Sequence, residues 1–151
     1  MAADPGPQRP GCAVGDTRRA MSQANVEVVR RVLAHWGRGY FADTELIHPD
    51  VRIVWLDVIG GSTETVGFKD ARETLRVWLG SFDRVTMSTE QLIDAGDKVV
   101  VLAVWRGVGK NSGVETEWRF GAVWTIRDGE VVSVMSHPDP DDALAAVGLS
   151  A

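Results

Sequence analysis

The chain has 151 residues, a length that suits one domain with a proper hydrophobic core. It is 44% hydrophobic and 25% charged with a net charge of −5, and this balance argues against a nucleic-acid-binding protein, which normally presents a basic face. No apolar stretch approaches the roughly 20 residues that cross a bilayer. We therefore expect a cytoplasmic protein that binds neither nucleic acid nor a membrane.

The first 20 residues differ in composition from the rest of the chain. They hold three of the six prolines and three glycines but almost no large apolar side chain. We predict that residues 1–20 are a disordered extension without a secretory signal, and that residues 21–151 form the domain, with Met21 as the natural start. Cys12 is the only cysteine, which excludes an intrachain disulfide and a cysteine-based metal cluster.

The first predicted helix runs from residue 22 to about residue 38. Ser22 can cap its start. Val29, Leu33 and Trp36 recur at the spacing of one helix face, so this face is expected to pack on the core.

A mixed segment follows. We expect a short helix over residues 41–47 that ends before Pro49, because a residue that precedes proline avoids the helical region. An opening strand is predicted from residue 51 to about residue 58, followed by a turn at the two glycines 60 and 61. Apolar residues at helical spacing then predict an amphipathic helix over residues 67–79.

Beyond this helix the hydrophobic period changes to two. Strands are predicted at 85–93, 99–106, 114–126 and 130–136, joined by the turn-rich connections "DAGDK", "GVGKNSG" and "RDGE". Such connections suit antiparallel hairpins. Pro140 begins a last short helix that ends at Gly148. The whole order predicts an α+β fold, in which two or three helices cover a cone-shaped, curved, mostly antiparallel meander and leave a cavity beneath them.

The strand at 114–126 has one apolar face and one polar face, so one side of the sheet is expected to be covered. At about 13 residues it exceeds the usual length of 5–6 residues and should bend, for which Gly121 is a suitable place. The neighbouring segment "VVVLAVW" is apolar on both faces. Its second face therefore needs cover from a helix or from a partner subunit.

Four segments fall in an order that resembles the nuclear transport factor 2-like superfamily. These are "MSQANVEVVRRVLAHWGRG", "LIHPDVRIVW", "GFKDARETLRVWL" and "VWTIRDGEVVSV". They are most similar to its SnoaL-like, ketosteroid-isomerase-related bacterial branch, and the resemblance covers about residues 22–149. It implies the cone fold, but the superfamily includes isomerases, dehydratases, cyclases, epoxide hydrolases and non-catalytic binders, so it does not fix an activity.

Asp57 is the first candidate catalytic residue. In a strand it would share a face with Ile53 and Trp55, and the resemblance places it where ketosteroid isomerases carry their general-base aspartate. A second interpretation stays open, because Asp first and Gly fourth in "DVIG" is also a common turn signature.

The other isomerase positions hold different residues. The resemblance brings Val32 and Ala122 to the two hydrogen-bond donors of the isomerases, and neither side chain can donate. Since losing one such donor typically costs about 10²–10³ in rate, steroid-type isomerisation is not expected. Of the epoxide hydrolase set, Arg106 is present without its matching acid. The acid that related cyclases carry near the last strand falls close to Ser136, and the adjacent His137 is a candidate proton carrier.

Six tryptophans are many for this length, and most are expected in the core. Three of them, Trp55, Trp118 and Trp124, can line an apolar pocket suited to a flat ring-containing ligand. The predicted ligand-binding residues are Val32, Trp36, Trp55, Trp118, Ala122 and Trp124. The three histidines lack metal-ligand spacing, so neither a metal nor a cofactor is expected.

Three functions stay open. The first is a cofactor-independent isomerase or cyclase that moves a proton in an apolar, cyclic substrate with Asp57 as the base. The second is a non-catalytic protein that binds a small ligand in the same cone. The third is an interaction module whose sheet packs on a partner protein. The resemblance also implies a homodimer formed through the sheet.

Overall fold

The computed structural model describes residues 9–37, 45–56 and 62–149, with side chains from residue 22 onward. Within these ranges the chain forms three helices and one six-stranded sheet. The elements in chain order are α1 (Arg9–Gly37), β1 (Ile47–Trp55), β2 (Thr63–Val66), α2 (Phe68–Leu79), β3 (Phe82–Ala95), β4 (Lys98–Gly109), β5 (Glu115–Arg127), β6 (Glu130–His137) and α3 (Pro140–Ala146).

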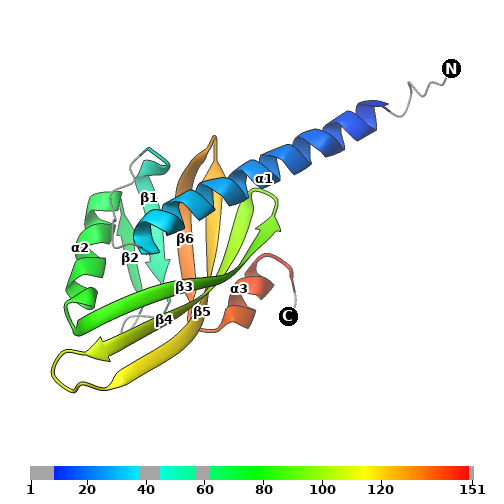
Figure 1. Cartoon of the computed structure of the whole chain (residues 1–151). Coiled ribbons are helices and arrows are strands. Elements are labelled where there is room, and N and C mark those ends of the chain that lie inside the picture. The colour runs from blue at the N-terminus through cyan, green and yellow to red at the C-terminus, as the bar shows by residue number, and fades with distance from the viewer. Residues whose placement is uncertain (1–8, 38–44, 57–61, 150–151) are drawn as a thin grey trace.

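The strands are ordered β2-β1-β6-β5-β4-β3 across the sheet. Every neighbouring pair is antiparallel except β1 and β6, which run parallel. Figure 1 shows the long strands β3, β4 and β5 curving together, with α1 crossing one face of the sheet and α2 beside it. The predicted α+β cone with a mostly antiparallel meander is therefore confirmed.

The antiparallel hairpin predicted at "RDGE", between β5 and β6, is also confirmed. Asp128 and Gly129 have φ values of 54° and 79°, the left-handed pair that a type I′ turn requires. Arg127 and Glu130 pair directly across this turn.

The helix α3 likewise follows its sequence signals. The Asp139 side chain caps it by accepting a hydrogen bond from the Asp141 backbone N–H at 2.9 Å, and Pro140 occupies the first turn.

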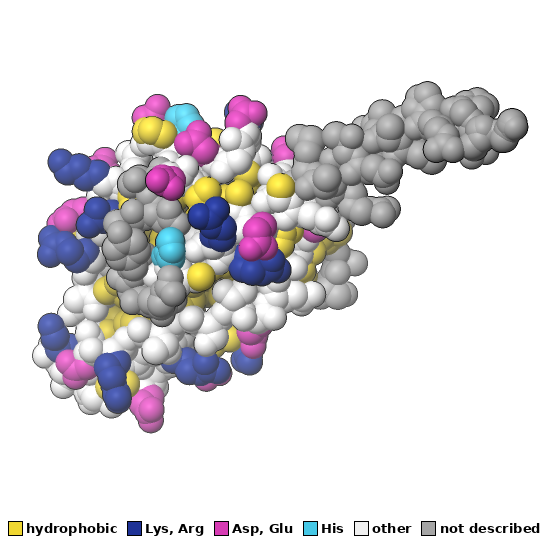
Figure 2. All heavy atoms as spheres, turned by 45° about the horizontal axis from the view of Figure 1, so that its top comes forward, with side chains coloured by type: hydrophobic (Ala, Val, Ile, Leu, Met, Phe, Trp, Pro, Cys, Tyr) yellow, Lys and Arg dark blue, Asp and Glu magenta, His cyan; other side chains and the backbone are white. Residues whose placement is uncertain are grey.

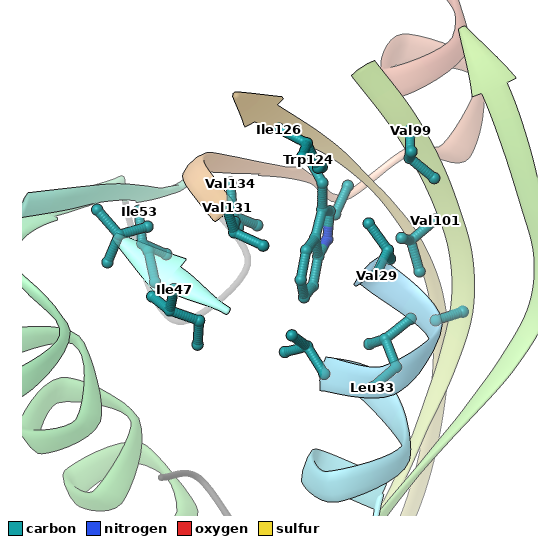
Figure 3. Close-up of a cluster of buried hydrophobic side chains, with 14 of the residues drawn as sticks. Val29, Leu33, Ile47, Ile53, Val99, Val101, Trp124, Ile126, Val131 and Val134 are labelled. Atoms are coloured by element: carbon teal, nitrogen blue, oxygen red, sulfur yellow. The ribbon is translucent and has the colours of Figure 1, made fainter. Parts of the chain in front are cut away.

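The core lies between α1 and the covered face of the sheet. Val29, Val32 and Leu33 of α1 are buried against residues of β1, β4, β5 and β6. Figure 3 shows Trp124 in the middle of this cluster, between Val101 of β4 and Val134 of β6.

The second face of β4 is covered by a helix. Val100 of β4 and Val123 of β5 pack with Ala143 and Leu144 of α3. Alternation along β4 places Val100 on the face opposite Val99 and Val101. The sequence required either a helix or a partner subunit to cover the second face of "VVVLAVW". The structure shows a helix there.

Gly121 has a packing role in this contact. A Cβ atom at this position would lie 2.6 Å from Cβ of Ala143 and 3.1 Å from Cα of Pro140. The strand needs glycine here because α3 approaches the backbone closely, a reason that differs from the bend expected from strand length.

The first helix begins earlier than predicted. It starts at Arg9, so residues 9–20, expected to be disordered, are helical, and Figure 1 shows this part of α1 extending beyond the sheet. Pro10 is tolerated in a first turn, and the alanines and arginines that follow favour helix even without packing. The boundary proposed at Met21 stays a prediction.

The start of β1 also differs from the sequence prediction. Of the short helix expected at 41–47, residues 41–44 lie outside the described residues, Glu45 and Leu46 form a turn, and Ile47 already belongs to β1. Pro49 is accommodated because the pairing of β1 with β6 shifts register between Ile47 and Arg52, and proline is tolerated at such an irregularity.

The strand β2 was not predicted, because four residues of sequence "TETV" carry little hydrophobic pattern. It pairs with the end of β1, and Arg52 Nε donates to Glu64 Oε2 at 2.6 Å across the two strands. Figure 2 shows charged side chains of both signs interspersed over the face on view. None of the described helices has the length and apolar character needed to cross a membrane.

Candidate functional site: an aromatic cavity

A cavity of about 300 Å³ lies between α1, α2 and the covered face of the sheet. The sheet contributes alternate residues, such as Val101 and Trp105 of β4, because side chains of a strand point to one face at every second position. The helix α2 contributes Phe68, Leu75 and Leu79, whose spacing places them on one helix face. The amphipathic pattern that predicted α2 thus also directs its apolar side toward the cavity.

Aromatic rings dominate the wall. Among the described residues, those that line the cavity with a ring are Trp36, Trp55, Phe68, Trp78, Phe82, Trp105, Phe120 and Trp124. The polar lining side chains in the same part of the chain are Arg72, Asp83 and Ser136. Such a ratio of apolar wall to a few polar groups is typical of small-molecule sites.

The rings form two groups. At one end Trp36 of α1 stacks near Phe68 of α2, with centroids 6.5 Å apart, and lies 5.3 Å from Trp124 of β5. At the other end Trp78 of α2 meets Phe82 at 5.3 Å and Trp105 at 5.1 Å, both edge-on. Phe68 and Trp78 are ten residues apart on one helix, or about 15 Å at 1.5 Å per residue.

The polar residues occupy different depths. Ser136 is 5% exposed, the one polar side chain that is buried among the described residues. Its backbone C=O accepts a hydrogen bond from the Leu56 N–H at 3.0 Å, which joins β6 to the residue that follows β1. Arg72 and Asp83 are exposed, so they lie where the cavity opens to solvent.

Four of the six predicted ligand-binding residues line the cavity: Trp36, Trp55, Ala122 and Trp124. Val32 instead is fully buried in the core beneath α1 and does not contribute to the wall. Trp118 does not line the cavity, and its ring centroid lies 5.8 Å from that of Trp78, which does.

The two predicted catalytic residues have different outcomes. Asp57 lies outside the described residues, so its role stays a prediction. His137 is on β6 directly opposite Gly121, at the face of the sheet that α3 covers. Ser136, the residue before His137, pairs with Ala122 and lines the cavity on the other face. Among the described residues, His137 Nε2 is buried without a hydrogen-bond partner. A role for His137 as proton carrier therefore also stays a prediction, and it is not part of the cavity wall.

Arg106 lies away from the cavity. It forms an ion pair with Glu117, with Nε 2.8 Å from Oε2, and both side chains are about half exposed. Among the described residues, hydrogen bonds within exposed ion pairs lower the pKa of Glu64 and Glu73 and raise the pKa of Arg52, Arg76 and Arg119, and none of these groups lines the wall. Within the described ranges, no three His, Cys, Asp or Glu side chains are grouped to hold a metal ion.

Sequence reasoning missed the far half of the wall. Trp78 and Trp105 line it, and neither was among the predicted ligand-binding residues. One signal was available for Trp105. It pairs directly with Trp118, a predicted pocket residue, in the β4–β5 hairpin, so the two side chains share one face of the sheet. The position of α2 over the sheet depends on tertiary packing that no local pattern specifies.

Comparisons with known proteins agree with this architecture. A family model described as a SnoaL-like domain matches residues 29–134. An NTF2-like protein of unknown function from Burkholderia pseudomallei is 21% identical, with a TM-score of 0.68 over 83% of this chain and 98% of that one. No curated protein matches the sequence.

Two further solved structures are similar. TerC, co-crystallised with polyporic acid, is 21% identical with a TM-score of 0.66 over 82% of this chain and 98% of that one. A protein from Jannaschia sp., provisionally described as a SnoaL-like polyketide cyclase, is 23% identical with a TM-score of 0.65 over 83% and 92% of the two chains. At these identities the likeness shows the fold alone.

Proposed function

The chain belongs to the SnoaL-like family, and from this premise we propose that it binds an apolar, ring-containing small molecule in the aromatic cavity. The observation that carries the proposal is the wall itself, in which eight of the described lining residues are aromatic and three are polar. A volume of about 300 Å³ is at the lower end of the range for ligand sites, about 300–1,000 Å³. A molecule of two or three rings suits this volume.

The wall is held in place before a ligand arrives. The edge-on contacts of Trp78 with Phe82 and Trp105 fix the planes of these rings, with interplanar angles of 64° and 82°. Because such rings need no ordering on binding, less conformational entropy is lost and affinity improves. A rigid aromatic wall also favours rigid cyclic ligands over flexible chains of similar size.

Ser136 supplies a polar group inside the apolar wall. Its hydroxyl makes no hydrogen bond to the other described residues, and the side chain lines the cavity. A ligand carbonyl or hydroxyl can use it as a partner, which would orient the ligand. The co-crystallisation of TerC with polyporic acid supports small-molecule binding in this fold.

The catalytic form of the proposal assigns proton transfer to Asp57, without cofactor or metal. The alternative is a non-catalytic binder with the same cavity. One observation favours this alternative: the positions that the resemblance assigned to hydrogen-bond donors hold Ala122, which lines the wall, and Val32, which is core.

The third function, a sheet that packs on a partner protein, remains a prediction together with the homodimer. Part of the outer sheet face is covered by α3. Beside it, Glu90, Arg119, Glu117 and Arg106 form exposed ion pairs across β3, β4 and β5. Sedimentation at micromolar concentration tests the homodimer, and a monomer alone would contradict it.

Tryptophan fluorescence tests the binding proposal with two ketones of ten carbons. 1-Decalone is bicyclic, 2-decanone is an open chain, and neither is aromatic. We expect 1-decalone to change the emission saturably and 2-decanone to do so only at several-fold higher concentration. If neither ketone changes the emission, the cavity is not a ligand site of this kind.

A matched pair of variants locates the binding. Ala122 lines the cavity, whereas Ala103 on the adjacent strand is core outside the wall. We expect Ala122→Leu to fill the cavity and abolish the response to 1-decalone with little loss of stability. Ala103→Leu has no void to fill, so it should destabilise the fold by about 1–3 kcal/mol. Unchanged binding by Ala122→Leu would place the ligand elsewhere.

A further inference from the structure

Arg72 is a cation in the cavity wall. It lies on α2 and lines the cavity, and its guanidinium carbon is 6.0 Å from the centroid of the Phe68 ring. Within the part of the chain that the structure describes, it forms no ion pair. By contrast, Arg76, one turn further along the same helix, donates from Nε to Glu73 at 3.2 Å. Among the described residues, the arginine outside the wall is therefore ion-paired and the one in the wall is not.

The contact with Phe68 positions this charge. A cation within about 6 Å of a ring centroid is attracted to the ring face, so the guanidinium rests on a ring that itself lines the cavity. A guanidinium binds a carboxylate through two parallel hydrogen bonds, and holding it in place lowers the entropy cost of doing so. The N–H groups of the Arg72 guanidinium are therefore available to a ligand that occupies the cavity.

The second charged residue of the wall lies apart from Arg72. Asp83 also lines the cavity, yet no ion pair joins the two within the described residues. Asp83 follows Phe82, which contacts Trp78, and Trp78 is six residues, or about 9 Å, beyond Arg72 on α2. A ligand anion therefore has one favourable place, at Arg72, and one unfavourable place, near Asp83. This asymmetry would fix which end of the ligand carries the charge.

We propose that the ligand of the cavity is a ring-containing carboxylate whose anionic group is bound by Arg72 over the Phe68 ring. This inference rests on the proposed binding function and narrows its ligand class. The net charge of the chain is −5, which disfavours anions in general. A preference for an anionic ligand would therefore have a local origin.

Two ligands of the same size separate charge from shape. 2-Naphthoate is an anion at neutral pH, and 2-naphthamide is its neutral counterpart. Binding is followed through the indole N–H signals of the tryptophans in a ¹⁵N-labelled protein. We expect naphthoate to bind about tenfold more tightly than naphthamide, the scale of one charge-assisted hydrogen bond. The preference should shrink in 0.5 M NaCl because the site is open to solvent.

Arg72→Gln tests the residue, and Arg76→Gln is its control on the same helix. We expect Arg72→Gln to lose the preference for naphthoate while naphthamide binds within about twofold of the unchanged protein, and Arg76→Gln to retain the preference. Equal affinity of the two ligands for the unchanged protein, or a preference that survives in Arg72→Gln, would overturn the inference and leave the binding function intact. Failure of both ligands to shift any indole signal would instead contradict the binding function itself.

Discussion

Trp78 of α2 and Trp105 of β4 meet edge-on, with ring centroids 5.1 Å apart and ring planes at 82°. The contact joins the helix to the sheet at one end of the cavity. Trp105 stands opposite Trp118 in the β4–β5 pairing, and Trp118 in turn contacts Trp78 from outside the wall. One cross-strand pair of tryptophans therefore contains a wall residue and a supporting residue.

This pair offers a matched test of the wall. Trp105→Leu removes a ring that lines the cavity, whereas Trp118→Leu removes one that does not. We expect Trp105→Leu to weaken binding of 1-decalone about five- to tenfold, the scale of about 40–55 Å² of lost apolar contact at about 25 cal/mol per Å². Trp118→Leu should change affinity by no more than about twofold. Calorimetric titration of both variants checks this, and equal losses would reject the distinction between wall and support.

Gly121 should not tolerate a methyl group. Gly121→Ala places a Cβ atom 2.6 Å from Cβ of Ala143, and we expect a loss of about 1–3 kcal/mol of unfolding free energy in urea. Adding Ala143→Gly removes the closest contact but costs about 1 kcal/mol of helix propensity. The double variant should therefore lose less than the sum of the two single losses. Strict additivity would show that α3 does not press on the strand at this point.

Asp57 carries the catalytic form of the proposal. If it is a base in reach of a bound ketone, it takes a proton from a carbon beside the carbonyl and leaves an enolate, which then takes a deuteron from D₂O. We expect the protein to accelerate deuterium exchange into 1-decalone above the buffer rate, with a rate that falls at low pH as the carboxylate is protonated.

Asp57→Asn is the corresponding variant. It should lose the acceleration while retaining affinity for 1-decalone, as NMR and fluorescence can measure on the same samples. Exchange at the buffer rate in the unchanged protein, together with binding, would identify a non-catalytic binder.

The β1–β2 ion pair predicts a pH dependence. Hydrogen bonds from Arg52 to the Glu64 carboxylate, at 2.6 and 3.2 Å, hold the pKa of Glu64 below its ordinary value of 4.5. A lowered pKa means that the pair contributes stability above pH 4.5, and that this contribution is lost as pH falls through the depressed pKa. Both groups are exposed, so the effect on melting temperature should be small.

Arg52→Gln should raise the pKa of Glu64 toward 4.5, which NMR titration of the side-chain carboxyl carbon measures. Glu64→Gln should lower the melting temperature slightly at pH 7 and no longer do so once the pH is below the depressed pKa of Glu64. Glu115→Gln removes an exposed charge that forms no ion pair with the other described residues, and so controls for net charge. A Glu64 pKa that does not respond to Arg52→Gln would contradict the pairing.

The sequence predicted the sheet better than it predicted the site. Alternation along residues 114–126 placed Trp118 and Trp124 on one face, and that is correct. A shared face is not a shared cavity, however, because Trp118 lies nearer the start of β5, beside Trp78, and does not line the wall. The helix α2 decides where the cavity ends, and the contact of its Trp78 with Trp105 of β4 is a tertiary feature.

The resemblance transferred the fold more reliably than individual residues. Val32 was carried over as a cavity residue, but its helix turns it into the core with Val29 and Leu33. The early start of α1 at Arg9 shows a related limit, since proline and glycine content indicated disorder there. Composition averages over a segment, whereas a helix depends on where in its first turn a proline falls.

The central claim is that the aromatic cavity holds a cyclic apolar ligand, and a crystal structure of the protein soaked with 1-decalone tests it most directly. The account predicts the bicyclic ketone between the Trp36–Phe68–Trp124 group and the Trp78–Trp105 pair, with its carbonyl toward Ser136. An interior filled by the protein's own side chains, with the ketone absent or bound only on the outer surface, would contradict it.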